Sequence, residues 1–176
     1  MTINQQKQFE IVSCLELGDA QVYNHLMPLA LHPDVSKIWI VRSHESRNGG
    51  IPKSEYVLTP ERIKPMRWQS MFRACRKLSK RPQVKAFVSF NPIPYGLIAA
   101  MASRPYNKPI HYGFIGSDWY RNADGRYGAF LRPILKKADF FTATGPAMKQ
   151  EMVNYGFDED RISVLPHSID LDKFKI

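Results

Sequence analysis

Asp118 has the residue type and the sequence position of a catalytic acid or base. It follows the β-rich run Pro109–Ile115 and stands in the segment Gly116-Ser117-Asp118-Trp119-Tyr120. A carboxylate at the end of a strand can orient or deprotonate a hydroxyl nucleophile, and the neighbouring aromatic residues offer rings for stacking. A turn or capping aspartate is the alternative interpretation, and the sequence leaves it open. Asp118 is therefore the candidate catalytic residue.

Small, polar or backbone-permissive residues also follow the other predicted strands. Ligands of an open parallel sheet bind beyond the carboxyl ends of its strands, so these positions are candidates for substrate binding. A plain turn selects the same residue types, and that alternative stays open for each of them. The candidate substrate-binding residues are Gly18, Asp19, Asn91, Gly116, Ser117, Trp119, Gly145 and His167.

Several common catalytic and binding motifs do not occur in the sequence. No GxGxxG follows the first predicted strand and no GxxxxGK[ST] is present, which argues against a dinucleotide oxidoreductase and a P-loop NTPase. The five histidines form no HExxH or paired ligand spacing, so we expect no metal site. Because GxSxG is also absent, serine hydrolysis has no support.

Most of the net charge of +9 lies in residues 61–85, which hold nine Lys or Arg and one Glu. Spacing on a helical wheel predicts an amphipathic helix there, with an apolar stripe opposite a cationic face. Two interpretations remain: the cations are merely solvated, or they bind an anionic membrane surface. Nucleic acid is not expected as a partner, because the aromatic residues lie opposite the charges. The candidate membrane-binding residues are Arg67, Trp68, Arg73, Arg76, Lys77 and Lys80.

Strand-like and helix-like segments alternate along the 176 residues. This order is typical of an α/β fold, and we expect a Rossmann-like three-layer α/β/α domain with a mainly parallel sheet of about six strands. Residues 43–60, rich in Gly and Pro, are interpreted as a mobile excursion with at most a short strand at Tyr56–Leu58. The predicted strands are Phe9–Leu15, Lys37–Arg42, Val84–Phe90, Pro109–Ile115, Asp139–Ala143 and Arg161–Leu165. The predicted helices are Gln21–Leu31, Met66–Lys80, Pro94–Ser103, Tyr127–Lys137 and Pro146–Tyr155.

Composition indicates a reducing, cytoplasmic setting. The two cysteines are too few for a disulfide framework, and neither a signal peptide nor a membrane-spanning stretch can be recognised. Peripheral attachment at the inner face of the membrane would be compatible with the cationic helix.

Two segments carry a family resemblance. Residues Ala138–Phe174, ADFFTATGPAMKQEMVNYGFDEDRISVLPHSIDLDKF, resemble the end of the N-terminal domain in GT-B glycosyltransferases of the GT4 type. Pro109–Tyr120, PIHYGFIGSDWY, resembles the upstream strand that ends in HG.D in that family. Three places depart from the family pattern. Ile115 stands where the family usually has His, and Pro166-His167-Ser168 replaces Pro-Asn-Gly. Gly18-Asp19 keeps only one glycine of the pair that commonly follows the first strand.

The resemblance implies that the chain is one half of a GT-B architecture, namely the acceptor-side domain. Residues 1–170 would form this domain, and residues 171–176 would begin the interdomain linker. The resemblance also implies transfer of a sugar from a nucleotide-diphosphate sugar to a hydroxyl acceptor, with no tightly bound cofactor. The basic helix suggests that this acceptor is a lipid or a lipid-linked glycan. The donor would be held by a second domain or a separate subunit. Glu151 and Glu159 have E-x7-E spacing but lie in the wrong domain for the family's donor motif. The alternative is a non-catalytic binding or adaptor domain that uses the basic helix.

Overall fold

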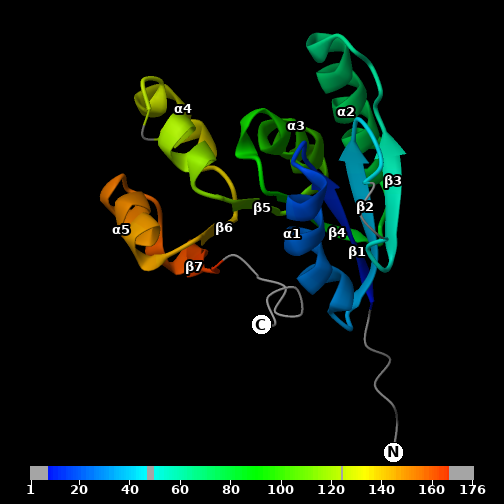
Figure 1. The fold of residues 1–176 in the computed structure, drawn as a ribbon, viewed down its shortest axis with the longest axis horizontal. Helices are drawn as coiled ribbons and strands as arrows, with labels where there is room; N and C mark the ends of the chain where they lie inside the picture. The colour runs from blue at the N-terminus through cyan, green and yellow to red at the C-terminus, as the bar shows by residue number, and fades with distance from the viewer. Residues whose placement is uncertain (1–7, 47–49, 124, 167–176) are drawn as a thin grey trace, which may run out of the picture.

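The computed structural model of this protein describes residues 8–46, 50–123 and 125–166. They form an α/β domain around one sheet of seven parallel strands in the order β3-β2-β1-β4-β5-β6-β7 (Figure 1). The strands are β1 (Phe9–Cys14), β2 (Val35–Arg42), β3 (Ser54–Leu58), β4 (Val84–Ser89), β5 (Ile110–Gly113), β6 (Phe140–Ala143) and β7 (Ile162–Val164). The α-helices are α1 (Asp19–Leu31), α2 (Lys64–Ser79), α3 (Leu97–Ser103), α4 (Gly128–Leu135) and α5 (Pro146–Asn154).

The sequence-based fold class is confirmed, with one strand more than expected. The additional strand, β3, lies inside the segment 43–60 and pairs in parallel with Ile38–Arg42 of β2. Ile51 and Thr59, on either side of β3, are buried. The short strand expected at Tyr56–Leu58 is present and begins two residues earlier, at Ser54. The rest of the expectation for 43–60 is wrong around this strand, because backbone pairing and two buried side chains hold residues 51–59 against the sheet instead of leaving them as an excursion.

Helices cover the two faces of the sheet unequally. Val22, Leu26 and Ala30 of α1 pack on one face, with alternate residues of β1, β2 and β4. The buried residues of α2, α3, α4 and α5 belong to the core on the other face, and these helices follow one another along the sheet in Figure 1. Among the described helices, one therefore covers the first face and four cover the second.

Among the described residues, no α-helix covers the α1 face at the β5–β7 half of the sheet. Side chains alternate along a strand, so Phe140 of β6 points away from the side on which Phe141 is buried. Phe140 is 57% exposed, whereas Phe141 is 2% exposed. This open half borders the pocket described below.

Two buried cysteines join β1 to α2. Cys14 and Cys75 are free thiols, both fully buried. A hydrogen bond with Cys75 and burial raise the pKa of the Cys14 thiol. The pair behaves as a small apolar contact in the core. Within the described residues, the helices are too short or too polar to cross a bilayer.

Candidate functional site

Because all seven strands are parallel, the residues that follow them meet at one edge of the sheet. Gly18 caps the start of α1 in an extended conformation, and Asp19 is the first residue of that helix. Asn91 follows β4 and donates its side-chain amide N–H to the carbonyl of Glu16 at 3.4 Å. Gly145 caps the start of α5 and has open space around its Cα. The structure thus places these four predicted residues at the carboxyl edge, as expected.

Asp118 is buried in the loop after β5. Its Oδ1 accepts hydrogen bonds from the backbone N–H groups of Ile115 at 2.9 Å and Trp119 at 3.0 Å. Its Oδ2 is also buried and has no hydrogen-bond partner among the described residues. Burial raises the pKa of Asp118 to about 6, against the opposing effect of the two backbone hydrogen bonds. One oxygen therefore fixes the turn, while the other takes no part in holding it.

The residues beside Asp118 differ in accessibility. Gly116 has a φ of +99°, a conformation that favours glycine, and Ser117 is exposed. The ring of Trp119 is fully buried, and its indole N–H donates to Oε2 of Glu151 at 2.9 Å. The predicted stacking role of Trp119 is not supported in this conformation, because its ring packs edge-on against Phe114 in the core.

A buried arginine that sequence reasoning missed lies under the β1–α1 loop. Arg42, the last residue of β2, has no exposed surface. Its guanidinium donates to Oδ1 of Asp19 at 3.1 Å, to the carbonyl of Leu17 at 2.9 Å and to the hydroxyl of Ser46 at 2.9 Å. The signal was a cation at the end of an otherwise apolar strand. Arg42 fixes the position of Gly18 and Asp19.

A second polar network joins the loops after β1 and β2. The carboxylate of Glu16 accepts from the backbone N–H of Ser43 at 2.6 Å and from its hydroxyl at 3.1 Å. The Ser43 hydroxyl lies 2.9 Å from Nδ1 of His44, and Nε2 of His44 lies 3.0 Å from the Arg42 guanidinium. Since that guanidinium can only donate, the neutral tautomer of His44 with the proton on Nδ1 satisfies all these contacts. The sequence offered no motif for this network.

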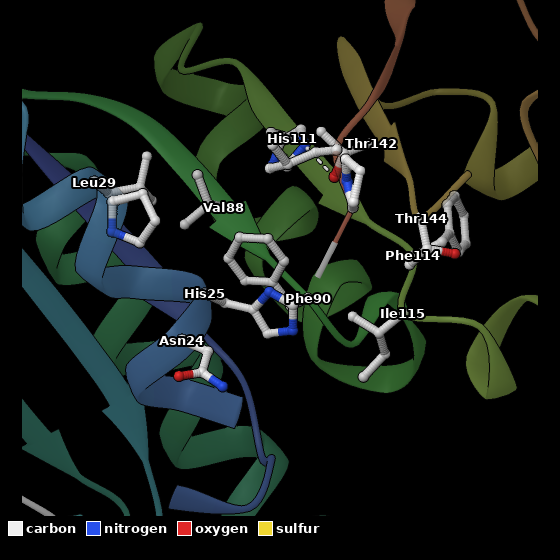
Figure 2. A pocket seen from close by; sticks show the side chains of 13 residues that line it. Asn24, His25, Leu29, Val88, Phe90, His111, Phe114, Ile115, Thr142 and Thr144 are labelled. Carbon is white, nitrogen blue, oxygen red and sulfur yellow. Dashed lines mark hydrogen bonds between the residues drawn. The ribbon is translucent and has the colours of Figure 1, made fainter. Parts of the chain in front are cut away.

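A pocket of about 350 Å³ lies between α1 and the carboxyl ends of β4, β5 and β6. Figure 2 shows side chains of α1 on one side of it and side chains of β5 and β6 on the other. None of its 13 lining residues is Asp, Glu, Lys or Arg. Its lining includes Asn24, His25, Leu29, Phe90, His111 and Thr142.

Two histidines in the pocket wall are held by aromatic and polar contacts. The ring of His25 stacks on Phe90 with centroids 4.5 Å apart, and Phe90 meets His111 edge-on at 5.9 Å. Nε2 of His111 lies 3.2 Å from the hydroxyl of Thr142 (Figure 2). Burial lowers the pKa of His111 to about 4, so its ring is neutral at physiological pH.

The basic segment forms α2, and its two ends differ. Met71, Cys75 and Leu78 are buried, as the predicted apolar stripe requires. Near the start of the helix, Ile63, Met66 and Trp68 are 61%, 54% and 38% exposed. The chain leaves β3 and runs to this end of α2, which projects beyond the carboxyl end of β3 (Figure 1).

The six predicted cationic-helix residues are not equally available. Arg73, Lys77 and Lys80 are exposed. Arg76 lies over the ring of Tyr106 at 4.9 Å, and Nε of Arg67 donates to the carbonyl of Glu61 at 2.8 Å. The remaining residue, Trp68, interacts through a side-chain hydrogen bond with Tyr95, which follows β4. The exposed start of α2 therefore lies next to the residues at the carboxyl edge.

Three further predictions concern His167, a metal site and the spacing of Glu151 and Glu159. His167 lies outside the described residues, as do Ser168, Asp170 and Phe174. Within the described residues, no group of three or more His, Cys, Asp or Glu could hold a metal ion. Glu151 accepts from Trp119, and Glu159 pairs with Lys149 at 3.3 Å.

Comparisons with known proteins place this fold in a defined group. In structure, the chain is similar to UDP-N-acetylglucosamine 2-epimerase from Rickettsia bellii, with a TM-score of 0.70 and 10% identity over 95% of this chain and 47% of that one. It is also similar to the lipopolysaccharide outer core galactosyltransferase WaaB, with a TM-score of 0.59 and 13% identity over 92% of this chain and 46% of that one. A third similar structure is Anabaena Alr3699/HepE, solved in complex with UDP and glucose. Its TM-score is 0.62 and its identity is 11%, over 96% of this chain and 47% of that one.

These structures are GT-B proteins, and this chain spans about half the length of each. At such low identities the similarity shows the fold alone. No curated protein matches the sequence. The profile of Glycosyltransferase Family 4, however, matches residues 36–173, which is more than half of the chain. Together with the parallel sheet and its carboxyl-edge site, this match shows that the chain belongs to Glycosyltransferase Family 4.

Proposed function

We propose that this chain is the acceptor-side domain of a glycosyltransferase that transfers a sugar from a nucleotide-diphosphate sugar to a hydroxyl acceptor. The observation that carries the proposal is Asp118: a buried carboxyl group at the carboxyl edge, with one oxygen fixed by the backbone and one unpartnered. Its pKa of about 6 is close to the value that suits a general base near neutral pH. The family match supports the reaction class.

The role of Asp118 depends on the stereochemistry of transfer. In an inverting reaction, Oδ2 takes the proton of the acceptor hydroxyl while the acceptor oxygen bonds to the sugar and the nucleoside diphosphate leaves. In a retaining front-face reaction, Asp118 holds the acceptor through a hydrogen bond and takes no proton. The donor is bound by a second Rossmann-like domain or a separate subunit. HepE, which is similar in fold, was solved with UDP and glucose.

The acceptor in this proposal is a lipid or lipid-linked glycan at a membrane surface, and the protein is peripheral at the cytoplasmic side. Cations of α2 bind anionic headgroups, each contributing on the order of 1 kcal/mol. The exposed side chains of Ile63, Met66 and Trp68 enter the interface. Because these residues lie next to the carboxyl edge, docking through them presents the site to the membrane.

The test is a transfer assay with a panel of nucleotide-diphosphate sugars, with the chain alone and with candidate donor-binding proteins added. Release of nucleoside diphosphate that requires this chain and an acceptor is the expected result. If no combination shows turnover and calorimetry detects no nucleotide-sugar binding, the glycosyltransferase proposal is wrong and the adaptor alternative is favoured.

A further inference from the structure

We propose that the pocket between α1 and the carboxyl ends of β4, β5 and β6 binds the uncharged, apolar part of the acceptor. This inference rests on the proposed function, because it identifies which part of the substrate lies where. It concerns the wall formed by His25, Leu29, Phe90 and His111, together with Ile115.

The first argument is electrical neutrality. The diphosphate of a nucleotide sugar needs cations or a row of backbone N–H groups. The pocket wall offers no Lys or Arg, and its buried His111 is neutral. His25 presents its ring in a stack with Phe90. An anionic donor is therefore a poor fit, and a neutral hydrocarbon or aromatic group is a good one.

The second argument is size. A volume of about 350 Å³ falls at the lower end of the 300–1,000 Å³ typical of small-molecule sites. It is large enough for a short isoprenoid, an acyl segment or an aromatic ring system. A whole nucleotide sugar would need more room and more polar contacts.

The third argument is position. Ile115 lines the pocket, and its backbone N–H donates to Oδ1 of Asp118. An acceptor whose apolar part fills the pocket would therefore contact a residue that holds the loop of Asp118, whose Oδ2 has no partner among the described residues. The hydroxyls of Thr142 and Thr144 at the β6 side provide neutral hydrogen-bond partners for the polar end of such a molecule.

The binding experiment uses two fluorescent probes with the same aromatic scaffold. N-phenyl-1-naphthylamine is neutral, and 1-anilinonaphthalene-8-sulfonate is anionic. At 0.3 M salt, we expect saturable binding of the neutral probe at one site, and at least 10-fold weaker binding of the sulfonate at that site. Competition by 1-decanol should displace the neutral probe.

Matched tryptophan substitutions locate the binding. Thr144→Trp and, independently, Leu29→Trp fill the pocket and should weaken the neutral probe at least 10-fold. Gln150→Trp, on the exposed side of α5, is the control and should leave it unchanged. Circular dichroism identifies a filled variant that fails to fold, and the second filled variant is then used to measure probe binding. Equal binding by the wild-type chain and a folded, filled variant overturns the proposal.

A transfer assay separates this inference from the proposed function. With methyl, octyl and decyl glycosides as acceptors, KM should fall at least 10-fold as the alkyl chain lengthens, and Leu29→Trp, which fills the apolar wall of the pocket, should remove this gain. Transfer that ignores chain length overturns the pocket assignment and leaves the glycosyltransferase proposal standing. Probe binding that weakens as the protein self-associates shows that a second copy covers the pocket, and this also overturns the assignment.

Discussion

The backbone N–H of Ile115 donates to Oδ1 of Asp118 at 2.9 Å, so a residue of the pocket wall and the buried carboxyl group belong to one turn. A group that fills the pocket and contacts Ile115 would therefore also contact the loop that holds Asp118. This geometry links the proposed acceptor pocket to the candidate catalytic group.

Replacing Asp118 tests that group. Asp118→Asn keeps an oxygen that can accept from Ile115 and Trp119, so we expect the fold to persist. Loss of a general base should lower kcat by about 10²- to 10⁴-fold, measured as nucleoside diphosphate release. Asp139→Asn is the matched control, because Asp139 accepts the backbone N–H of Ile110 at the opposite end of β5. Full activity in Asp118→Asn excludes a catalytic role.

The pH dependence of stability should contain two opposing contributions. The folded-state pKa of Asp118 is raised to about 6, so its contribution to the free energy of unfolding falls as pH rises from about 4 to 6. The pKa of His111 is lowered to about 4, so its contribution rises as pH increases from about 4 to 6.5. Each is on the order of 3 kcal/mol.

Single substitutions should separate the two contributions to the free energy of unfolding, measured by urea denaturation at pH 4 to 7. His111→Gln leaves the Asp118 effect, so stability should fall with rising pH. Asp118→Asn leaves the His111 effect, so stability should rise. Identical pH profiles for both variants would contradict these assignments.

The buried pair of Arg42 and Asp19 should be essential to stability. Arg42→Met removes the buried guanidinium that donates to the Asp19 carboxylate and to the Leu17 carbonyl, and we expect a loss of about 3–5 kcal/mol in the free energy of unfolding. Arg161→Met is the control: Arg161 pairs with Asp158 at 3.1 Å, but both side chains are about half exposed. We expect a change of less than about 1 kcal/mol there. Similar losses in the two variants would show that burial of Arg42 adds nothing.

Membrane binding through α2 should depend on both charge and apolar side chains. In co-sedimentation with vesicles containing anionic lipid, Arg73→Glu/Lys77→Glu should reduce partitioning roughly 30-fold or more, since two attractive charges are lost. Ile63→Ser/Met66→Ser should reduce it without changing net charge. Arg121→Glu/Arg126→Glu, after β5, matches the first variant in charge and should have a smaller effect. Equal pelleting with neutral and anionic vesicles would rule out the electrostatic mechanism.

The sequence was sufficient for the alternation of strands and helices and for the edge at which Asp118 lies, because hydrophobic runs and turn residues are local signals. It indicated only a short strand at Tyr56–Leu58 and missed that β3 is an edge strand of the sheet, since Ser54–Leu58 is stabilised by pairing with β2 rather than by its own pattern. It could not foresee that Trp119 is buried, because an aromatic residue after a strand looks the same whether it packs in the core or faces a ligand. Arg42 and the pocket depend on side chains brought together from distant positions, and such contacts leave no periodic signal.

The contact between Cys14 on β1 and Cys75 on α2 provides a built-in probe of helix detachment. Both thiols are inaccessible while α2 lies on the sheet, so a thiol reagent can modify them only when the helix lifts. The labelling rate therefore measures how often α2 separates from the rest of the domain. Comparing that rate in the presence and absence of vesicles would show whether a bilayer holds α2 in place or draws it away.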